Sequence, residues 1–146
     1  MKKIVIMGPK NSGKTTIADY IESDVSSTKF YGDIIYRLKT IEIPSNYLEN
    51  NWLKNIVIMI SQNQGFANIL VLNGNDLCHY YSPNFAKVFT KPTLGIITKA
   101  DLMDINSKEM AINIMNTLGC NYIFVSFKTG DGLLELGEWI LKFKEV

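Results

Sequence analysis

Eight residues near the start of the chain have the types and spacing needed to hold a row of phosphates. The run Gly8-Pro9-Lys10-Asn11-Ser12-Gly13-Lys14-Thr15 matches the pattern G-x-x-x-x-G-K-[ST] and directly follows the apolar residues 4–7. A buried strand that turns sharply into a helix leaves several backbone N–H groups without partners, at the positive end of the helix dipole. A polyphosphate can accept hydrogen bonds from those groups. We therefore expect a phosphate-binding loop here, rather than a glycine-containing turn that fits the pattern by chance.

The side chains of this loop have separate expected roles. Gly8 and Gly13 allow a close approach of backbone to phosphate that a Cβ would block. Lys14 would reach the β- and γ-phosphates, and the Thr15 hydroxyl would lie next to a Mg²⁺ ion, so these two residues are also the expected catalytic ones. The expected phosphate contacts are Gly8, Lys10, Asn11, Ser12, Gly13, Lys14, Thr15 and Thr16.

A second loop has the chemistry to select a base. Thr98-Lys99-Ala100-Asp101 follows the apolar residues 94–97. A carboxylate can accept two hydrogen bonds from the N1–H and N2–H₂ groups of guanine, whereas adenine offers no such pair, so Asp101 would favour guanine by ~1–3 kcal/mol. Lys99 would lay its aliphatic stem along the face of the base. Taken alone, these four residues would favour a solvated turn after a strand.

The whole chain has the size and composition of one soluble globular domain spanning residues 1–146. Apolar residues make up 47% and charged residues 20%, the usual balance of such proteins. The formal net charge of +1 gives no reason to expect nucleic acid or an anionic membrane as a partner. No apolar run approaches the ~18 residues of a membrane span. Cys78, Cys120 and His79 have no metal-ligand spacing and indicate ordinary thiols of a reducing compartment, so we expect a cytoplasmic protein.

Short apolar runs alternate with helix-compatible stretches along the chain. The runs lie at residues 4–7, 34–35 with Leu38, 41–43, 69–72, 94–97 and 122–125, and helices are expected at 15–22, 48–62, 108–118 and 133–142. Several runs are continuous, as in strands covered on both faces. The alternation predicts an α/β fold with a mostly parallel, six-stranded, doubly wound sheet. Ligands of such sheets bind beyond the carboxyl ends of the strands, where both loops described above would lie.

A third loop, Val-Ser-Phe-Lys-Thr-Gly-Asp-Gly at 125–132, follows the last expected strand. It resembles the Ser-Ala-Lys loop of small GTPases, whose backbone contacts the guanine oxygen. By this resemblance Ser126, Phe127 and Lys128 would contact the base. The three loops in this order resemble those of a P-loop NTPase with the Ras-like three-layer α/β/α fold. That resemblance implies GTP or GDP and Mg²⁺ as ligands.

The chain resembles, nearly end to end, the EutP/PduV family of small GTPase-like proteins of ethanolamine and propanediol utilisation. The resemblance rests on the opening Lys2-Lys3-Ile4 that leads directly into the phosphate loop, and on Thr98 where Ras-type GTPases have Asn. It rests also on residues 41–47, Ile-Glu-Ile-Pro-Ser-Asn-Tyr, which are similar to the family's Asp-Thr-Pro-Gly-Glu-Tyr. It implies association with bacterial microcompartments, with a shell protein or an enzyme as partner.

The chain departs from the GTPase pattern where Mg²⁺ and the γ-phosphate are normally held. Glu42 stands at the place of the metal-binding Asp, and Ser45 at the place of the Gly whose amide contacts the γ-phosphate. A carboxylate oxygen can still serve Mg²⁺, so Thr15 and Glu42 are the expected metal residues, and a solvent-facing strand end is the alternative for Glu42. Asn46 is too short to replace the Gln that orients water, so slow hydrolysis is expected.

Other segments are expected to play supporting roles. Residues 23–32, rich in Ser and Thr, should form a mobile connection, and Thr28 within them is a candidate for a second contact to Mg²⁺. Residues 78–89, with four aromatic residues, should cover the sheet rather than form a docking loop. The helix that begins near Trp52 should bury it against the sheet, and Trp139 should pack within the last helix.

Three functions stay open at this point. The first is a guanine-nucleotide-binding protein with slow, Mg²⁺-dependent GTP hydrolysis. The second, implied by the resemblance, is a kinase that moves a phosphoryl group from a nucleotide such as ATP to a small carboxylate such as acetate, an activity suggested within the family. The third is a non-catalytic module that docks on a microcompartment shell or partner enzyme and has kept nucleotide binding.

Overall fold

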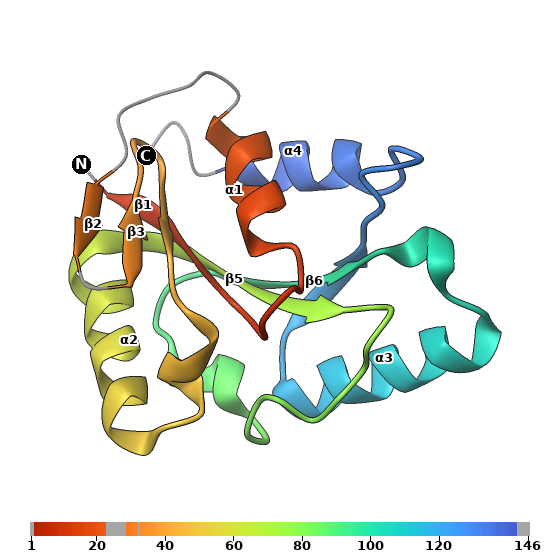
Figure 1. Cartoon of the computed structure of the whole chain (residues 1–146), viewed down its shortest axis with the longest axis horizontal. Coiled ribbons are helices and arrows are strands. Elements are labelled where there is room, and N and C mark those ends of the chain that lie inside the picture. The colour runs from red at the N-terminus through yellow and green to blue at the C-terminus, as the bar shows by residue number, and fades with distance from the viewer. Residues whose placement is uncertain (1, 23–28, 32, 143–146) are drawn as a thin grey trace.

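A seven-stranded sheet runs through the part of the chain that the computed structural model describes, which is residues 2–22, 29–31 and 33–142. The strand order is β2-β3-β4-β1-β5-β6-β7 (Figure 1). The strands are β1 (Lys3–Met7), β2 (Lys29–Tyr31), β3 (Ile34–Tyr36), β4 (Thr40–Glu42), β5 (Gly65–Asn73), β6 (Thr93–Thr98) and β7 (Asn121–Phe124). Strands β4, β1, β5, β6 and β7 are parallel, and β3 lies antiparallel between β2 and β4. The expected α/β fold with a mostly parallel sheet is thus confirmed.

All six expected strands are present, and β2 is a seventh. It lies within residues 23–32, which the sequence indicated to be a connection, and it pairs with β3 as the outer arm of a hairpin. A three-residue strand at a sheet edge carries no long apolar run, so periodicity does not detect it. The rest of that segment, including Thr28, lies outside the described residues.

The helices form one layer on each face of the sheet. Helices α1 (Lys14–Glu22) and α4 (Leu133–Leu141) cover one face, and α2 (Asn51–Gln64) and α3 (Ile105–Leu118) cover the other (Figure 1). Short 3-10 turns η1 (Ser45–Leu48), η2 (Phe85–Val88) and η3 (Ala100–Leu102) lie in connections. In β1, Ile4 and Ile6 pack under α1 and α4, while Val5 and Met7 pack on the opposite core. A strand covered on both faces must be apolar at every position, which explains the continuous runs.

Capping side chains set the helix starts. Helix α2 begins after Asn50, whose side-chain oxygen accepts hydrogen bonds from the backbone N–H groups of Trp52 and Leu53. Helix α3 begins after Asp104, which forms a capping box with Ser107. These caps satisfy orphan N–H groups of the first turn and fix both starts three residues away from the expected positions 48 and 108.

Residues 78–89 cover the sheet as expected, because Tyr81, Phe85 and Phe89 are buried in the core on the α2 and α3 side. Trp139 is half-buried and packs against the core under α1 and α4, also as expected. The expectation for Trp52 is wrong, since 75% of this residue is exposed. It lies in the first turn of α2, whereas the helix buries residues further along, such as Val57. Within the described residues, no helix has the length and apolar character to cross a bilayer.

Gly74 lies where the chain leaving β5 passes the end of β6. A Cβ at this position would lie 2.3 Å from the Thr98 carbonyl oxygen and 2.6 Å from the Met103 sulfur. Since backbone cannot easily yield, Gly74→Ala should lower the free energy of unfolding by about 1–3 kcal/mol, measured by urea denaturation. The control is Gly137→Ala in α4, where the nearest atom is the Tyr20 hydroxyl at 3.8 Å. This change should raise that free energy by ~0.5–1 kcal/mol, and equal effects of the two changes would contradict the contact described here.

Candidate functional site

The sheet brings the loops that follow its central strands to one edge. Strands β1, β5 and β6 are neighbours and run in the same direction, so the chain after Met7, Asn73 and Thr98 leaves the sheet on the same side. A pocket of about 920 Å³ lies at this edge. Its lining residues are Lys10, Asn11, Ser12, Gly13, Lys14, Thr15, Thr16, Asp33, Glu42, Pro44, Ser45 and Lys99. The phosphate loop, Glu42 and Lys99 therefore share one cavity.

The phosphate loop curls tightly around the Lys14 side chain. Lys14 Nζ donates hydrogen bonds to the carbonyl oxygens of Gly8 and Pro9, each at 2.9 Å. Gly13 has a φ of 103°, a conformation open mainly to glycine. A Cβ at Gly8 would lie 2.9 Å from Val71, so no side chain fits there. The loop geometry accounts for both glycines of the motif.

Two groups of this loop have properties that an anion would satisfy. The Ser12 hydroxyl is buried and has no hydrogen-bond partner in the described part of the chain. Burial lowers the pKa of Lys14 below its ordinary value, and the nearby Glu42 carboxylate acts in the opposite direction. An orphaned hydroxyl and a desolvated ammonium both gain by contact with phosphate oxygens.

The residues expected to hold Mg²⁺ touch each other. Thr15 Oγ1 donates a hydrogen bond to Glu42 Oε2 at 2.8 Å. Glu42 is only 8% exposed, which rules out the alternative of a solvent-facing strand end. Because the Thr15 proton is directed at the carboxylate, the lone pairs of the hydroxyl are available to a cation. A hydroxyl and carboxylates are the oxygen ligands that Mg²⁺ prefers, so the residues present fit this metal.

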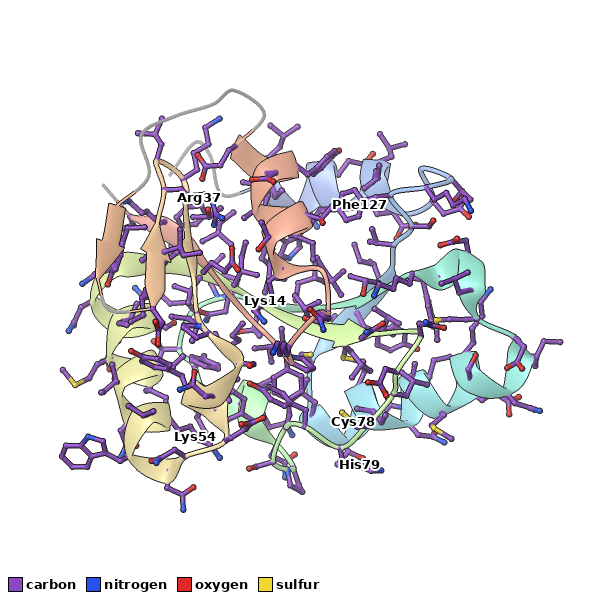
Figure 2. The ribbon with its side chains drawn as sticks, viewed as in Figure 1. Lys14, Arg37, Lys54, Cys78, His79 and Phe127 are labelled. Carbon is purple, nitrogen blue, oxygen red and sulfur yellow. The ribbon has the colours of Figure 1, made fainter. Side chains whose placement is uncertain are left out.

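Arg37, in the turn between β3 and β4, is a member of this cluster that the sequence motifs did not indicate. Its Nη2 lies 2.9 Å from Glu42 Oε1, and the two side chains are 10% and 11% exposed. Figure 2 places Arg37 between the β3–β4 hairpin and α1. The Glu42 carboxylate is therefore shared between Thr15 on one oxygen and Arg37 on the other.

The base loop is bound to the phosphate loop by direct hydrogen bonds. Thr98 Oγ1 donates to the Ser12 carbonyl oxygen at 2.5 Å, and Lys99 Nζ donates to the Asn11 carbonyl oxygen at 3.2 Å. Asn73 Nδ2 donates to the same Asn11 oxygen at 3.2 Å. Lys99 has a φ of 57°, so the chain turns sharply as it leaves β6. Motion of either loop would disturb the other.

The Asp101 carboxylate is held by the third loop. Ser126 Oγ donates a hydrogen bond to Asp101 Oδ1 at 2.8 Å, and Ser126 itself is buried. Asp101 is exposed, so its other lone pairs face solvent. Neither residue lines the pocket described above, and both lie beside it at the end of β6 and β7.

The structure separates the remaining expected contacts from that pocket. Thr98, Phe127 and Lys128 do not line it. The Phe127 ring packs edge-on against Tyr20 with 5.8 Å between ring centroids, and Figure 2 shows it beside α1 and α4. Lys128 is exposed. The Phe127 side chain therefore serves packing, which leaves the backbone of this loop as the part that can face a ligand.

Two further residues at the site belong to none of the sequence motifs. Asp33, in the turn before β3, lines the pocket together with Glu42. Tyr80 donates a hydrogen bond from its hydroxyl to the carbonyl oxygen of Ser45, and burial raises the pKa of Tyr80, so it stays a donor. The Tyr80 ring packs edge-on against buried Tyr81, with ring centroids 4.9 Å apart. The segment that follows β4 is thus fixed to the core. Asp33 and Tyr80 are brought to the site only when the chain folds, so adjacent residues in the sequence could not indicate either of them.

Comparisons with known proteins add to this geometry. A family model described as "Ethanolamine utilisation - propanediol utilisation", PduV-EutP, matches residues 1–142. The propanediol utilization protein PduV of Citrobacter freundii is 31% identical over 102 residues, which cover 70% of this chain and 67% of that protein.

Solved G domains have the same fold. The G domain of the T. maritima FeoB iron transporter matches with a TM-score of 0.65 at 20% identity, over 97% of this chain and 98% of that domain. The cytosolic domain of the same transporter in its GMPPNP form matches with a TM-score of 0.65 at 18% identity, over 98% of this chain and 64% of that one. The likeness confirms the expected P-loop NTPase fold of Ras-like, three-layer architecture.

The hydrogen bond from Tyr80 to Ser45 can be tested by removing one oxygen atom. Tyr80→Phe leaves a half-buried carbonyl without its donor, so the free energy of unfolding should fall by about 1 kcal/mol in a denaturant titration. The matched control is Tyr20→Phe, because the Tyr20 hydroxyl donates to the Leu133 carbonyl oxygen at 3.2 Å in an exposed position. That change should cost less than about 0.5 kcal/mol. If the two losses were the same, Tyr80 would not fix this segment.

Proposed function

The chain belongs to the PduV-EutP family of ethanolamine and propanediol utilisation, and on that premise we propose that it is a guanine-nucleotide-binding protein with slow, Mg²⁺-dependent GTP hydrolysis. One observation carries the proposal. The phosphate loop, the base loop and the third loop lie at the same sheet edge and are joined by the Thr98–Ser12, Lys99–Asn11 and Ser126–Asp101 hydrogen bonds. Such a chain of contacts fixes the distance between a phosphate cradle and a base-selecting carboxylate.

The phosphates are bound by the loop that surrounds Lys14. The Lys14 ammonium exchanges its two carbonyl contacts for phosphate oxygens, which carry full negative charge and accept stronger hydrogen bonds. The buried Ser12 hydroxyl gains the partner that it lacks. The N-terminus of α1, which begins at Lys14, adds backbone N–H groups and the positive end of a helix dipole.

The base is selected by Asp101. Ser126 donates to one of its oxygens, which orients the carboxylate and leaves lone pairs for the N1–H and N2–H₂ donors of guanine. The Lys99 stem lies along the base, with its ammonium on the Asn11 carbonyl oxygen. Adenine presents an acceptor where guanine has N1–H, so it would leave the carboxylate unpaired and is disfavoured.

The metal is held by Thr15, with Glu42 in support. Asp33, in the turn before β3, lines the same pocket and offers a further carboxylate oxygen as a ligand for the metal. When bound, Mg²⁺ neutralises phosphate charge that builds up as the terminal phosphoryl group is transferred. Lys10 also lines the pocket and can stabilise that charge.

Hydrolysis is slow because Asn46 does not replace the Gln that orients water in Ras-type enzymes. Asn46 lies in η1, is exposed and does not line the pocket. The preceding residue, Ser45, is tied through its carbonyl oxygen to Tyr80. The segment that senses the γ-phosphate in Ras-type enzymes is therefore already fixed, and it lacks the Gln of those enzymes.

Membership of this family supports a role beside ethanolamine or propanediol breakdown. The relative from Citrobacter freundii is named as a propanediol utilization protein. We assign the protein to the cytoplasm, in association with the microcompartment in which such pathways run, with a shell protein or enzyme as its partner. Co-purification of the tagged protein with intact microcompartments tests this assignment, and its consistent absence from them would refute it.

Base selection is tested by calorimetric titration with GDP and ADP. The wild-type protein should bind GDP at least about tenfold more tightly than ADP, and Asp101→Asn should weaken GDP binding by about 10- to 100-fold. Ser126→Ala should weaken it by about fivefold, because the carboxylate loses its orienting donor. Glu109→Gln, which removes an exposed carboxylate on α3, is the control and should change neither affinity. Equal affinities of the wild type for GDP and ADP would refute guanine selection.

The buried position of Lys14 predicts a proton uptake on binding. In the free protein the pKa of Lys14 lies below its ordinary value because of burial. Bound phosphate favours the ammonium form and raises that pKa, so affinity should fall as pH rises through the lowered value. Calorimetric titration of the protein with nucleotide at about pH 9, in buffers of different ionisation enthalpy, measures the number of protons taken up on binding.

Lys14→Arg is the control for this measurement, because a guanidinium stays charged at any such pH. The ionisation of the nucleotide itself is common to both proteins, so the difference in proton uptake isolates the lysine. No difference between the two proteins would show that Lys14 is already fully charged before the nucleotide binds.

A further inference from the structure

A buried arginine lies directly behind the carboxylate expected to serve the metal. Strand β3 pairs with β4 so that Ile35 lies opposite Glu42, and the Arg37 N–H donates to the Thr40 carbonyl oxygen. Side chains two positions apart in a strand point to the same face. Arg37 and Glu42 are therefore diagonal neighbours on the face of the hairpin that α1 covers, near Thr15 in the first turn of that helix.

The Glu42 carboxylate has partners for both of its oxygens without any bound ion. Glu42 Oε2 takes the Thr15 proton, and Glu42 Oε1 faces Arg37 Nη2 at 2.9 Å. A carboxylate that is 11% exposed is costly to bury unless a positive group compensates it. Arg37 supplies this charge permanently, because a guanidinium does not lose its proton in proteins.

Arg37 acts through Glu42 and not on the phosphates. It is absent from the residues that line the pocket in the described part of the chain, whereas Glu42 and Thr15 are among them. Its Nη1 is buried and finds no hydrogen-bond partner there, so the guanidinium is held in place chiefly by the ion pair. A cation in this position lowers the negative potential that Glu42 presents to the pocket.

We propose that Arg37 is a built-in counter-cation for Glu42, and that it makes guanine-nucleotide binding only weakly dependent on Mg²⁺. This inference rests on the nucleotide binding proposed above. A divalent ion gains affinity from a nearby carboxylate in proportion to the charge that is left uncompensated. With Arg37 in place that gain is small, and Glu42 keeps a positively charged partner when no metal is bound. Arg37 is thus a positioning residue that sets the metal demand of the site.

The test compares GDP dissociation constants in excess EDTA and in millimolar Mg²⁺. For the wild type the ratio of the two constants should be below about fivefold. Arg37→Gln keeps a hydrogen-bond donor next to Glu42 but removes the charge, so this ratio should rise by about tenfold or more. Arg37→Lys keeps the charge, and its ratio should stay within about threefold of the wild type.

A second pair of measurements keeps the test informative if the single change unfolds the protein. The double variant Arg37→Met with Glu42→Gln removes both charges and leaves side chains of similar length, so it should fold. Its ratio should stay as low as that of the wild type, because position 42 then presents no uncompensated charge to the metal, and Asp33 is the same in both proteins. The wild-type ratio does not depend on the folding of any variant.

The possible failures are distinguishable. If the wild type binds GDP neither with nor without Mg²⁺, the proposed function is wrong and this inference goes with it. If the wild type binds GDP but its dissociation constant in EDTA exceeds that in Mg²⁺ by more than about fivefold, the counter-cation proposal alone is overturned. A ratio in Arg37→Gln that is unchanged or smaller than that of the wild type also overturns it, because Arg37 would then only orient Glu42.

Discussion

The parallel pairing of β1 with β4 on one side and β5 on the other decides where every functional group lies. Ile6 lies opposite Glu42 in one pairing and opposite Ile69 in the other. Successive side chains of a strand point to opposite faces, so a slip of β4 by one residue would turn Glu42 into the opposite core. The contact between Glu42 and Thr15 exists only in the observed register. The apolar residues of β1 hold that register because both of its faces are buried.

Helix α1 contacts the sheet through polar as well as apolar side chains. Near its start, Thr15 donates to Glu42, and at its end Glu22 accepts hydrogen bonds from the Lys39 N–H and the Thr40 hydroxyl. The helix that presents the phosphate loop is therefore attached to β4 and the turn before it at both ends. Buried polar groups of this kind add little net stability but specify one arrangement, which suits a site that must place several groups within fractions of an ångström.

A feature could be predicted from the sequence where the residues that encode it are adjacent in the chain. The phosphate loop, its flanking strand and helix, and the base loop ending in Asp101 are encoded by adjacent residues, and the fold inferred from them is the observed one. Arg37 and Tyr80 could not be found in this way, because each acts on residues brought near only by strand pairing or by a loop folded over the core. Trp52 misled the interpretation, because apolar character indicates burial only where the buried face of the helix is known, and the buried residues of α2 lie further along, at Val57, Ile60 and Ser61.

The central position of β1 has a consequence for how the protein is made. This strand is synthesised before both of its neighbours, because β4 and β5 begin at Thr40 and Gly65, so its apolar residues stay unpaired until those strands have been made. Contacts between residues so far apart in the chain form slowly, and an unpaired apolar strand is prone to aggregate in the meantime. The nascent chain cannot close its phosphate loop until β5 and β6 have been translated, since Ser12 and Asn11 are held by Thr98 and Asn73. Ligand binding during translation is thereby restricted to chains that have grown past Thr98.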